Sequence, residues 1–121
     1  MKAPEDIINI MYRKGRESDM KEQEHKKFGL EFIEAERDYN KALSMKMLAL
    51  KAEGHAISTC EKLAKGDPLI ADLKFEMDKR DILRDSCKKL MANIYTQIDI
   101  LRSDLSFQKE DYRRISSTQQ S

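Results

Sequence analysis

The sequence has few of the residues that interrupt helices, with two prolines and four glycines among 121 residues, and it has no tryptophan. Charged residues make up 37% of the chain and the hydrophobic set 40%. This composition, rich in Lys, Glu, Asp, Leu, Ile, Met and Ala, is typical of long helices or coiled coils. We therefore expect an all-α chain, and its length suits one domain.

A charge excess of either sign is also absent, because 23 basic residues face 22 acidic ones. This balance excludes the basic excess typical of an autonomous nucleic-acid binder, although a local basic stripe remains open. No apolar run approaches the 18 residues of a membrane span. The first residues, Met-Lys-Ala-Pro-Glu-Asp, lack the apolar core of a signal peptide. We expect a cytoplasmic protein without a membrane partner.

Cysteine is scarce, since Cys60 and Cys87 are the only two. Two cysteines are too few for a disulfide framework and fit a reducing compartment. Cys87 lies 19 residues beyond Pro68, roughly 28 Å along a helix that starts there. A disulfide needs Cα atoms within about 7 Å, so both residues are expected to be buried free thiols.

The start and stop signals of the chain predict four helices. Residues 4–14 begin with proline and acids and end with Arg13-Lys14-Gly15, which predicts a short N-terminal helix. Ser18 and Asp19 can cap a second helix over residues 18–53, where apolar residues recur in steps of four and three. Gly54 is expected to end it.

A short helix over residues 58–65 is predicted next, because Ser58-Thr59-Cys60-Glu61 has the pattern of a capping box. Gly66-Asp67-Pro68 is a strong helix-start signal, with Asp67 as the N-cap and Pro68 at the first helical position. The final helix should run over residues 68–114. Residues 116–121 are expected to form a flexible tail.

The last helix presents an apolar series that should face the second helix. The series thins between Met77 and Leu83. From Leu83 onward its steps are four, three, four, four, three and four, and the extra step of four resembles a coiled-coil stutter. The expected series is Leu69, Leu73, Met77, Leu83, Cys87, Leu90, Ile94, Ile98, Leu101 and Leu105.

The expected architecture is a long antiparallel helical hairpin, coiled-coil-like, with a short helix at the joint and a short helix at the N-terminus, together forming one domain over residues 1–115. Two helices share one seam, which seldom stabilises so small a unit alone. The surplus apolar positions predict self-association, in the form of a homodimeric four-helix bundle, or contact with another protein. The residues expected at this interface are Ile7, Ile8, Met11, Met91, Ile94, Tyr95, Ile98, Leu101 and Leu105.

Candidate catalytic residues are few. Glu22 and His25 have the Glu-x-x-His spacing of di-metal helical bundles, but the final helix supplies no histidine to complete such a site. His55 and Cys60 do not make a zinc site without two further ligands. Phosphate loops, metalloprotease motifs and nucleophile elbows are absent from the sequence. The sequence therefore favours a protein that is not an enzyme and that needs no metal or cofactor.

Direct binding of single-stranded nucleic acid is the alternative. Basic residues and two tyrosines could meet at the open end of the hairpin, where the second helix starts and the last one ends. Aromatic rings beside basic groups are a usual device for holding single strands. The residues concerned are Tyr12, Arg13, Lys14, Arg16, Lys26, Lys27, Tyr112, Arg113 and Arg114.

Three segments also carry a family resemblance: Leu48-Ala-Leu-Lys-Ala-Glu-Gly54, Cys60-Glu-Lys-Leu-Ala-Lys-Gly-Asp67 and Ile70-Ala-Asp-Leu-Lys-Phe-Glu-Met-Asp78. Over about residues 45–105 the chain resembles small helical proteins of bacteriophages that infect Gram-positive bacteria. Those proteins tend to be encoded among recombination and replication genes. The resemblance implies a phage or prophage accessory factor in the bacterial cytoplasm and transfers no functional residue. An inhibitor that docks on a host defence protein is a further interpretation.

Overall fold

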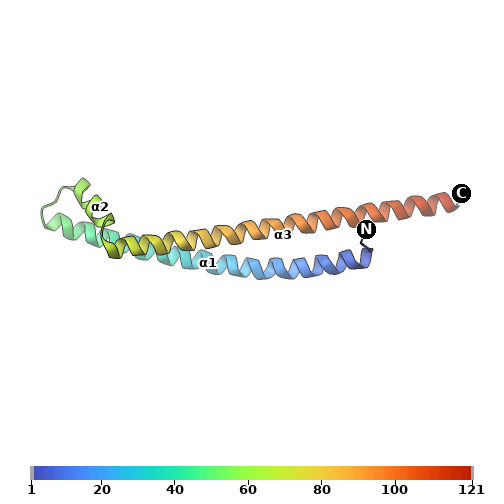
Figure 1. Ribbon diagram of the computed structural model, residues 1–121, viewed down its shortest axis with the longest axis horizontal. Helices are drawn as coiled ribbons and strands as arrows, with labels where there is room; N and C mark the ends of the chain where they lie inside the picture. The colour runs from blue at the N-terminus through green and yellow to red at the C-terminus, as the bar shows by residue number, and fades with distance from the viewer. Residues whose placement is uncertain (1, 121) are drawn as a thin grey trace. The chain divides into compact units, whose positions relative to one another are not determined.

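The computed structural model describes residues 2–120, with side chains through residue 116. It contains helices α1 (Pro4–Ala52), α2 (Ile57–Lys65) and α3 (Pro68–Gln120), and no strand occurs within those residues (Figure 1). Helices α1 and α3 pack against each other in opposite directions, and α2 connects them. The predicted all-α antiparallel hairpin with a short helix at its joint is confirmed.

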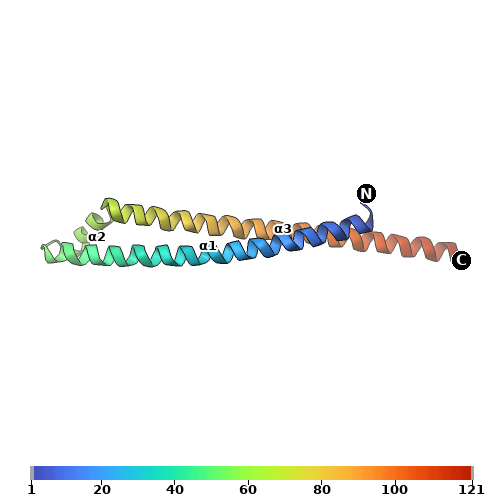
Figure 2. The same cartoon turned by 90° about the horizontal axis from the view of Figure 1, so that it is seen from below.

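Contacts divide the chain into two compact units. Unit 1 combines Met1–Glu24 with Cys87–Ser121, and unit 2 is the continuous segment His25–Ser86. In both ribbon views the blue start of α1 in unit 1 lies beside the orange part of α3 (Figures 1 and 2). Unit 2 holds the joint with α2. A single domain over residues 1–115 stays a prediction.

Helix α1 is continuous through Gly15, so the break predicted between residues 14 and 18 is wrong. A glycine ends a helix by adopting a left-handed backbone, and Gly15 does not have a positive φ. Ser18 is buried at 5% exposure and is not an N-cap, while Lys14 and Lys21 are half-buried on the same face. Packing of this face against α3 maintains the helix across the glycine.

The end of α1 is a Schellman motif, as the glycine signal predicts. Gly54 has φ of 97°, and its N–H donates to the Lys51 carbonyl at 3.0 Å. The His55 N–H donates to the Leu50 carbonyl at 3.3 Å. These two bonds satisfy carbonyls that the helix end would otherwise leave unpaired.

Helix α2 begins one residue earlier than predicted, and the capping box is wrong. Ala56 occupies the N-cap with an extended backbone and makes no side-chain cap. The chain leaves Gly54 so that the Cys60 N–H reaches the Ala56 carbonyl at 2.9 Å, which places Ser58 inside the first turn. Glu61 instead accepts a hydrogen bond from Lys65 at 2.9 Å, and this ion pair lowers the pKa of Glu61 and raises that of Lys65.

The predicted start of α3 is confirmed. Oδ1 of Asp67 accepts hydrogen bonds from the backbone N–H groups of Leu69 at 3.0 Å and Ile70 at 3.4 Å. Its other oxygen lies 3.5 Å from Nζ of Lys46 on α1. The same carboxylate therefore caps α3 and contacts α1 at the joint.

The core of unit 2 lies where the three helices meet. Its most buried members come from all three of them, and each is at most 9% exposed: Tyr39, Leu50, Cys60, Ala64 and Ile70. Ala42, Leu43, Met47, Leu73 and Met77 pack around them.

The face of α3 that packs on α1 differs from the predicted series. Leu69, Leu83 and Leu90 are exposed by 67%, 36% and 48%, whereas Ile70 is buried and Met91 half-buried. The predicted stutter is wrong, because Met91 and not Leu90 lies in the seam, and steps of three and four then alternate without an extra four. Arg80 and Arg84 occupy the seam positions between Met77 and Cys87. Arg80 pairs with Glu31 across the seam, and the long aliphatic stem of arginine allows such partial burial.

Unit 1 has a small core between α1 and α3. Ile7 is fully buried, Ile94 is 5% exposed and Cys87 is 3% exposed. Sγ of Cys87 donates a hydrogen bond to the Lys21 carbonyl at 3.2 Å. At the open end, the Gln108 side chain donates to the Lys2 carbonyl at 2.9 Å, so both long helices contribute to this unit.

Helix α3 continues to Gln120, beyond its predicted end at Arg114. Glutamine is a good helix former, and serine and threonine are only moderately poor ones, so these residues do not stop an established helix. The side chains of residues 117–120 and all of Ser121, on which most of the predicted tail falls, lie outside the described residues.

Candidate protein-binding groove

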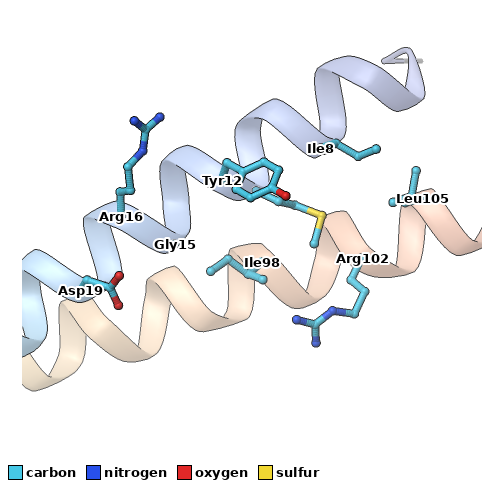
Figure 3. A pocket seen from close by; sticks show the side chains of 9 residues that line it. Ile8, Tyr12, Gly15, Arg16, Asp19, Ile98, Arg102 and Leu105 are labelled. Carbon is cyan, nitrogen blue, oxygen red and sulfur yellow. The ribbon is translucent and has the colours of Figure 1, made fainter.

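A groove lies between α1 and α3 in unit 1 and has a volume of about 580 Å³ (Figure 3). Apolar side chains dominate its lining, with two arginines and one aspartate among them. The residues that form this groove are Ile8, Met11, Tyr12, Gly15, Arg16, Asp19, Ile98, Arg102 and Leu105.

The helical spacing explains why these residues meet. On α1, Ile8, Tyr12, Gly15 and Asp19 are separated by steps of four, three and four and therefore share one helix face. On α3, Ile98 and Leu105 are seam positions two turns apart, and their partly buried side chains form the floor. The groove is thus the edge of the helix–helix contact.

Tyr12 is the most exposed large hydrophobic side chain in the groove, at 71%, and Ile8 is 40% exposed. The Tyr12 ring projects over the space between the two helices (Figure 3), and Ile98 on α3 lines the same groove. An exposed aromatic ring beside half-buried aliphatic side chains offers a large contact area at low cost in side-chain entropy.

Charged groups border the apolar centre. Arg16 and Arg102 extend away from it on opposite sides, and Asp19 lies at the end away from Ile8 and Leu105 (Figure 3). Arg102 is paired with Asp99 on its own helix at 3.3 Å. Within the described residues neither Arg16 nor Asp19 forms an ion pair. An apolar centre with a charged rim is the usual anatomy of a protein interface.

Gly15 leaves an opening in the wall of the groove. Apart from its neighbouring residues and the backbone of its own helix, a Cβ atom built on Gly15 would meet no described atom within 4 Å. Gly15 is the one glycine in the lining, and the space beside its backbone is open.

The nine residues predicted for the interface divide into four groups. Ile8, Met11, Ile98 and Leu105 line the groove, and Tyr95 is 48% exposed on α3. Met91 and Leu101 are half-buried. Ile7 and Ile94 are buried in the core of unit 1, so in this arrangement they hold α1 against α3.

The residues predicted to contact nucleic acid do not form one cluster. Tyr12 and Arg16 line the groove, while Lys14 is half-buried and paired with Glu17 at 3.5 Å. Arg13 and Arg114 are exposed in unit 1. Lys26 and Lys27 are exposed in unit 2, because α1 begins at Pro4 and its residues 26–27 are not a helix start.

Tyr112 and Arg113 belong to a separate hollow of unit 1. Tyr112 is 73% exposed and Pro4, Gln108 and Lys109 complete the lining. This hollow has a volume of about 340 Å³. It holds two basic side chains and one aromatic ring.

Two hollows of unit 2 have a different character. One is lined by four carboxylates, Glu31, Glu34, Asp38 and Glu76, together with Arg80. The other lies at the joint between α1 and α2, where exposed Leu48 and Ile57 border Cys60.

The two histidines have no metal-site geometry around them. His55 lies 3.7 Å from Glu53, and its backbone carbonyl accepts a weak hydrogen bond from Sγ of Cys60 at 3.6 Å. His25 is half-buried on α1 and Glu22 is exposed. The described part of the chain contains no group of three His, Cys, Asp or Glu side chains arranged to hold a metal ion.

The chain matches no protein-family model, no curated protein and no solved structure. The resemblance to bacteriophage proteins therefore stays a prediction. Within residues 2–120, no helix has both the length and the apolar character that crossing a bilayer requires.

Gly15 and Asp19 are parts of the groove that the sequence did not indicate. In the sequence the glycine indicates a helix end, and the aspartate indicates part of a helix start. Once α1 is known to be one continuous helix, the sequence spacing shows that both residues share a helix face with Ile8 and Tyr12.

Proposed function

We propose that this chain is a non-enzymatic accessory protein that acts through protein–protein contacts at the groove of unit 1. The observation that carries the proposal is the exposure of Tyr12 beside an apolar groove formed by both helices. Exposed apolar patches with a polar rim mark interaction sites, and tyrosine and arginine are enriched in the residues that contribute most to binding.

The chemistry of the groove supports binding more than catalysis. Its lining offers a single carboxylate, Asp19, and no histidine, cysteine or lysine. General acid–base and nucleophilic catalysis usually need at least two such groups within hydrogen-bond reach. The groove thus provides contact area and charge at its rim.

The setting that we propose is bacteriophage DNA recombination or replication, in the cytoplasm of the bacterial host. The support for this setting is the sequence resemblance over residues 45–105, together with the scarcity of cysteine. A phage protein partner fits this setting, and a host protein partner would fit an inhibitor.

Affinity capture from phage-infected bacteria tests the proposal. Tagged wild-type chain is compared with Tyr12→Asp and with Ile82→Asp, a control on unit 2 whose residue is similarly exposed, at 66%. A charge at the centre of an interface is buried without a partner when the complex forms. The Tyr12→Asp chain should therefore fail to capture the partner protein. Capture that is equal for all three chains would contradict the groove as the binding surface.

Single-strand binding is the second candidate, because the hollow at Tyr112 brings an exposed ring beside Lys109 and Arg113. Fluorescence anisotropy with a labelled single-stranded oligonucleotide at low salt tests it. Binding through phosphates would weaken steeply as salt rises. If the affinity for the oligonucleotide is high and falls in the double variant Tyr112→Ala/Arg113→Ala, this second function replaces the first. Absence of binding excludes the second function.

A further inference from the structure

No contact within the described chain requires a glycine at position 15. A glycine inside a helix costs about 1 kcal/mol relative to alanine. At Gly15 the backbone is helical, and apart from the neighbouring residues and the backbone of its own helix no described atom lies within 4 Å of the place where a Cβ would be. The fold of the chain would therefore accept alanine and gain stability. A glycine on an open helix face instead permits close approach by another molecule.

The residues that α1 contributes to the groove have an internal symmetry. They form three pairs, each centred between Arg13 and Lys14. In a two-fold contact between antiparallel copies of one helix, the members of such pairs face each other. The pairs are Ile8 with Asp19, Met11 with Arg16, and Tyr12 with Gly15.

The pair of Tyr12 and Gly15 matches a bulky ring with an opening. Tyr12 is 71% exposed, and the surface at Gly15 has no side chain. A two-fold arrangement brings the Tyr12 ring of each copy over Gly15 of the other, so the same contact occurs twice in the dimer. Met11 of one copy would meet the aliphatic stem of Arg16 of the other, a contact that methionine and arginine tolerate well.

Charge at the ends of the groove is complementary under the same arrangement. Asp19 lies at one end, and Arg102 lies toward the end formed by Ile8 and Leu105 (Figure 3). Reversal of a second copy places Asp19 of each chain at the Arg102 end of the other. Asp19 has no ion-pair partner within the described residues, so the second copy would supply one.

We infer that the partner of the groove is a second copy of this chain, bound antiparallel, with Tyr12 of each copy packed on Gly15 of the other. This inference rests on the proposed function, because it names the occupant of the same groove. The two copies form a homodimer around a two-fold axis, and each copy closes the groove of the other. A bulky residue at position 15 would prevent the close approach.

Sedimentation equilibrium from micromolar to a hundred micromolar tests the inference on the full chain. The wild-type chain should give twice its mass of 14.1 kDa at the upper end. Gly15→Ala should raise the dissociation constant on the order of tenfold, which is a typical cost for one disturbed contact at an interface centre. Thermal melts at concentrations below that constant should show that the variant monomer is more stable than the wild type.

Gly29→Ala is the matched control. Gly29 lies in the same helix, in unit 2, and a Cβ there would be in ordinary contact with Cδ of Arg84 at 3.8 Å. It should stabilise the helix similarly and leave the dissociation constant unchanged.

A 14.1 kDa species at all concentrations would overturn the inference. Equal effects of Gly15→Ala and Gly29→Ala on dimerisation would also overturn it, since the interface would lie elsewhere. Neither result contradicts the proposed function, because the groove would then be free for a different protein. The proposed function fails only if no protein, an untagged copy of this chain included, is captured in a way that depends on Tyr12. Loss of dimer confined to Gly15→Ala supports the inference.

Discussion

The guanidinium of Arg84 on α3 lies over the ring of Phe32 on α1, with its central carbon 4.3 Å from the ring centroid. The same group donates a hydrogen bond to Asp81. Arg84 is at a seam position, where coiled coils usually place an apolar residue. In unit 2 an arginine therefore fills the space between the helices and keeps its charge satisfied.

Replacing Arg84 by lysine should destabilise the protein although the charge is kept. A lysine ammonium cannot stack flat on the ring or hold Asp81 with a planar fork, so we expect a loss of about 0.5–1 kcal/mol in unfolding free energy. Urea unfolding measures it. Arg102→Lys, at a more exposed site, is the control and should change the free energy by less than about 0.5 kcal/mol. Equal losses would contradict the stacking role.

This seam shows what the sequence could and could not predict. Local signals that agree with one another predicted the hairpin, its joint and the Asp67 cap. They did not predict the register of α3, because Leu83 and Leu90 continue the apolar series in the sequence, whereas Arg84 and Met91 form the seam in the structure. Arginine is counted as polar, yet its stem packs like a hydrophobic side chain. The actual seam is set by contacts with α1, which a single helix does not display.

Asp67 and Ser58 separate a real cap from an apparent one. Asp67→Ala removes the side-chain acceptor for two N–H groups of α3 and should cost about 1 kcal/mol. Ser58→Ala should be nearly neutral, because Ser58 makes no cap in α2. Thermal and urea unfolding of both variants provide the comparison. A clear loss for Ser58→Ala would mean that the sequence pattern, and not Ala56, describes the start of α2.

Gly54 and Gly66 should also respond differently to alanine. Gly54 has φ of 97°, where a side chain is strained, so Gly54→Ala should cost about 1–2 kcal/mol. Gly66 has φ of −82°, and a Cβ there would meet carbonyl oxygens at 3.5 and 3.6 Å, which is ordinary contact. Gly66→Ala should be neutral or slightly stabilising in urea unfolding. The reverse order would contradict the Schellman ending of α1.

Cys87 should react slowly with thiol reagents in the folded protein. Burial raises the pKa of its thiol, and the hydrogen bond to the Lys21 carbonyl uses its proton. Because the folded state keeps this proton to higher pH than the unfolded state does, its contribution to the unfolding free energy falls as pH rises above about 8.5. Absorbance with a disulfide reagent, in a Cys60→Ala background, reports the rate. A rate equal to that of an unfolded control would contradict this burial.

The candidate groove was only partly predictable. Ile8, Met11, Ile98 and Leu105 stand out as surplus apolar residues on their helices. The role of Gly15 was hidden, because the same residue that ends many helices here lies inside one. The distinction depends on the burial of Ser18 and the partial burial of Lys21 against α3, a tertiary effect that overrides local propensity.

Photo-cross-linking at position 12 tests the central claim most directly. Tyr12 is replaced by the photoreactive amino acid p-benzoylphenylalanine, and Phe75 of unit 2, exposed by 66%, is replaced in a control chain. Both chains are irradiated in phage-infected cells. The account predicts a defined protein adduct from position 12, a second copy of this chain included, and none from position 75. No adduct from position 12, or the same adducts from both positions, would contradict a protein-binding groove in unit 1.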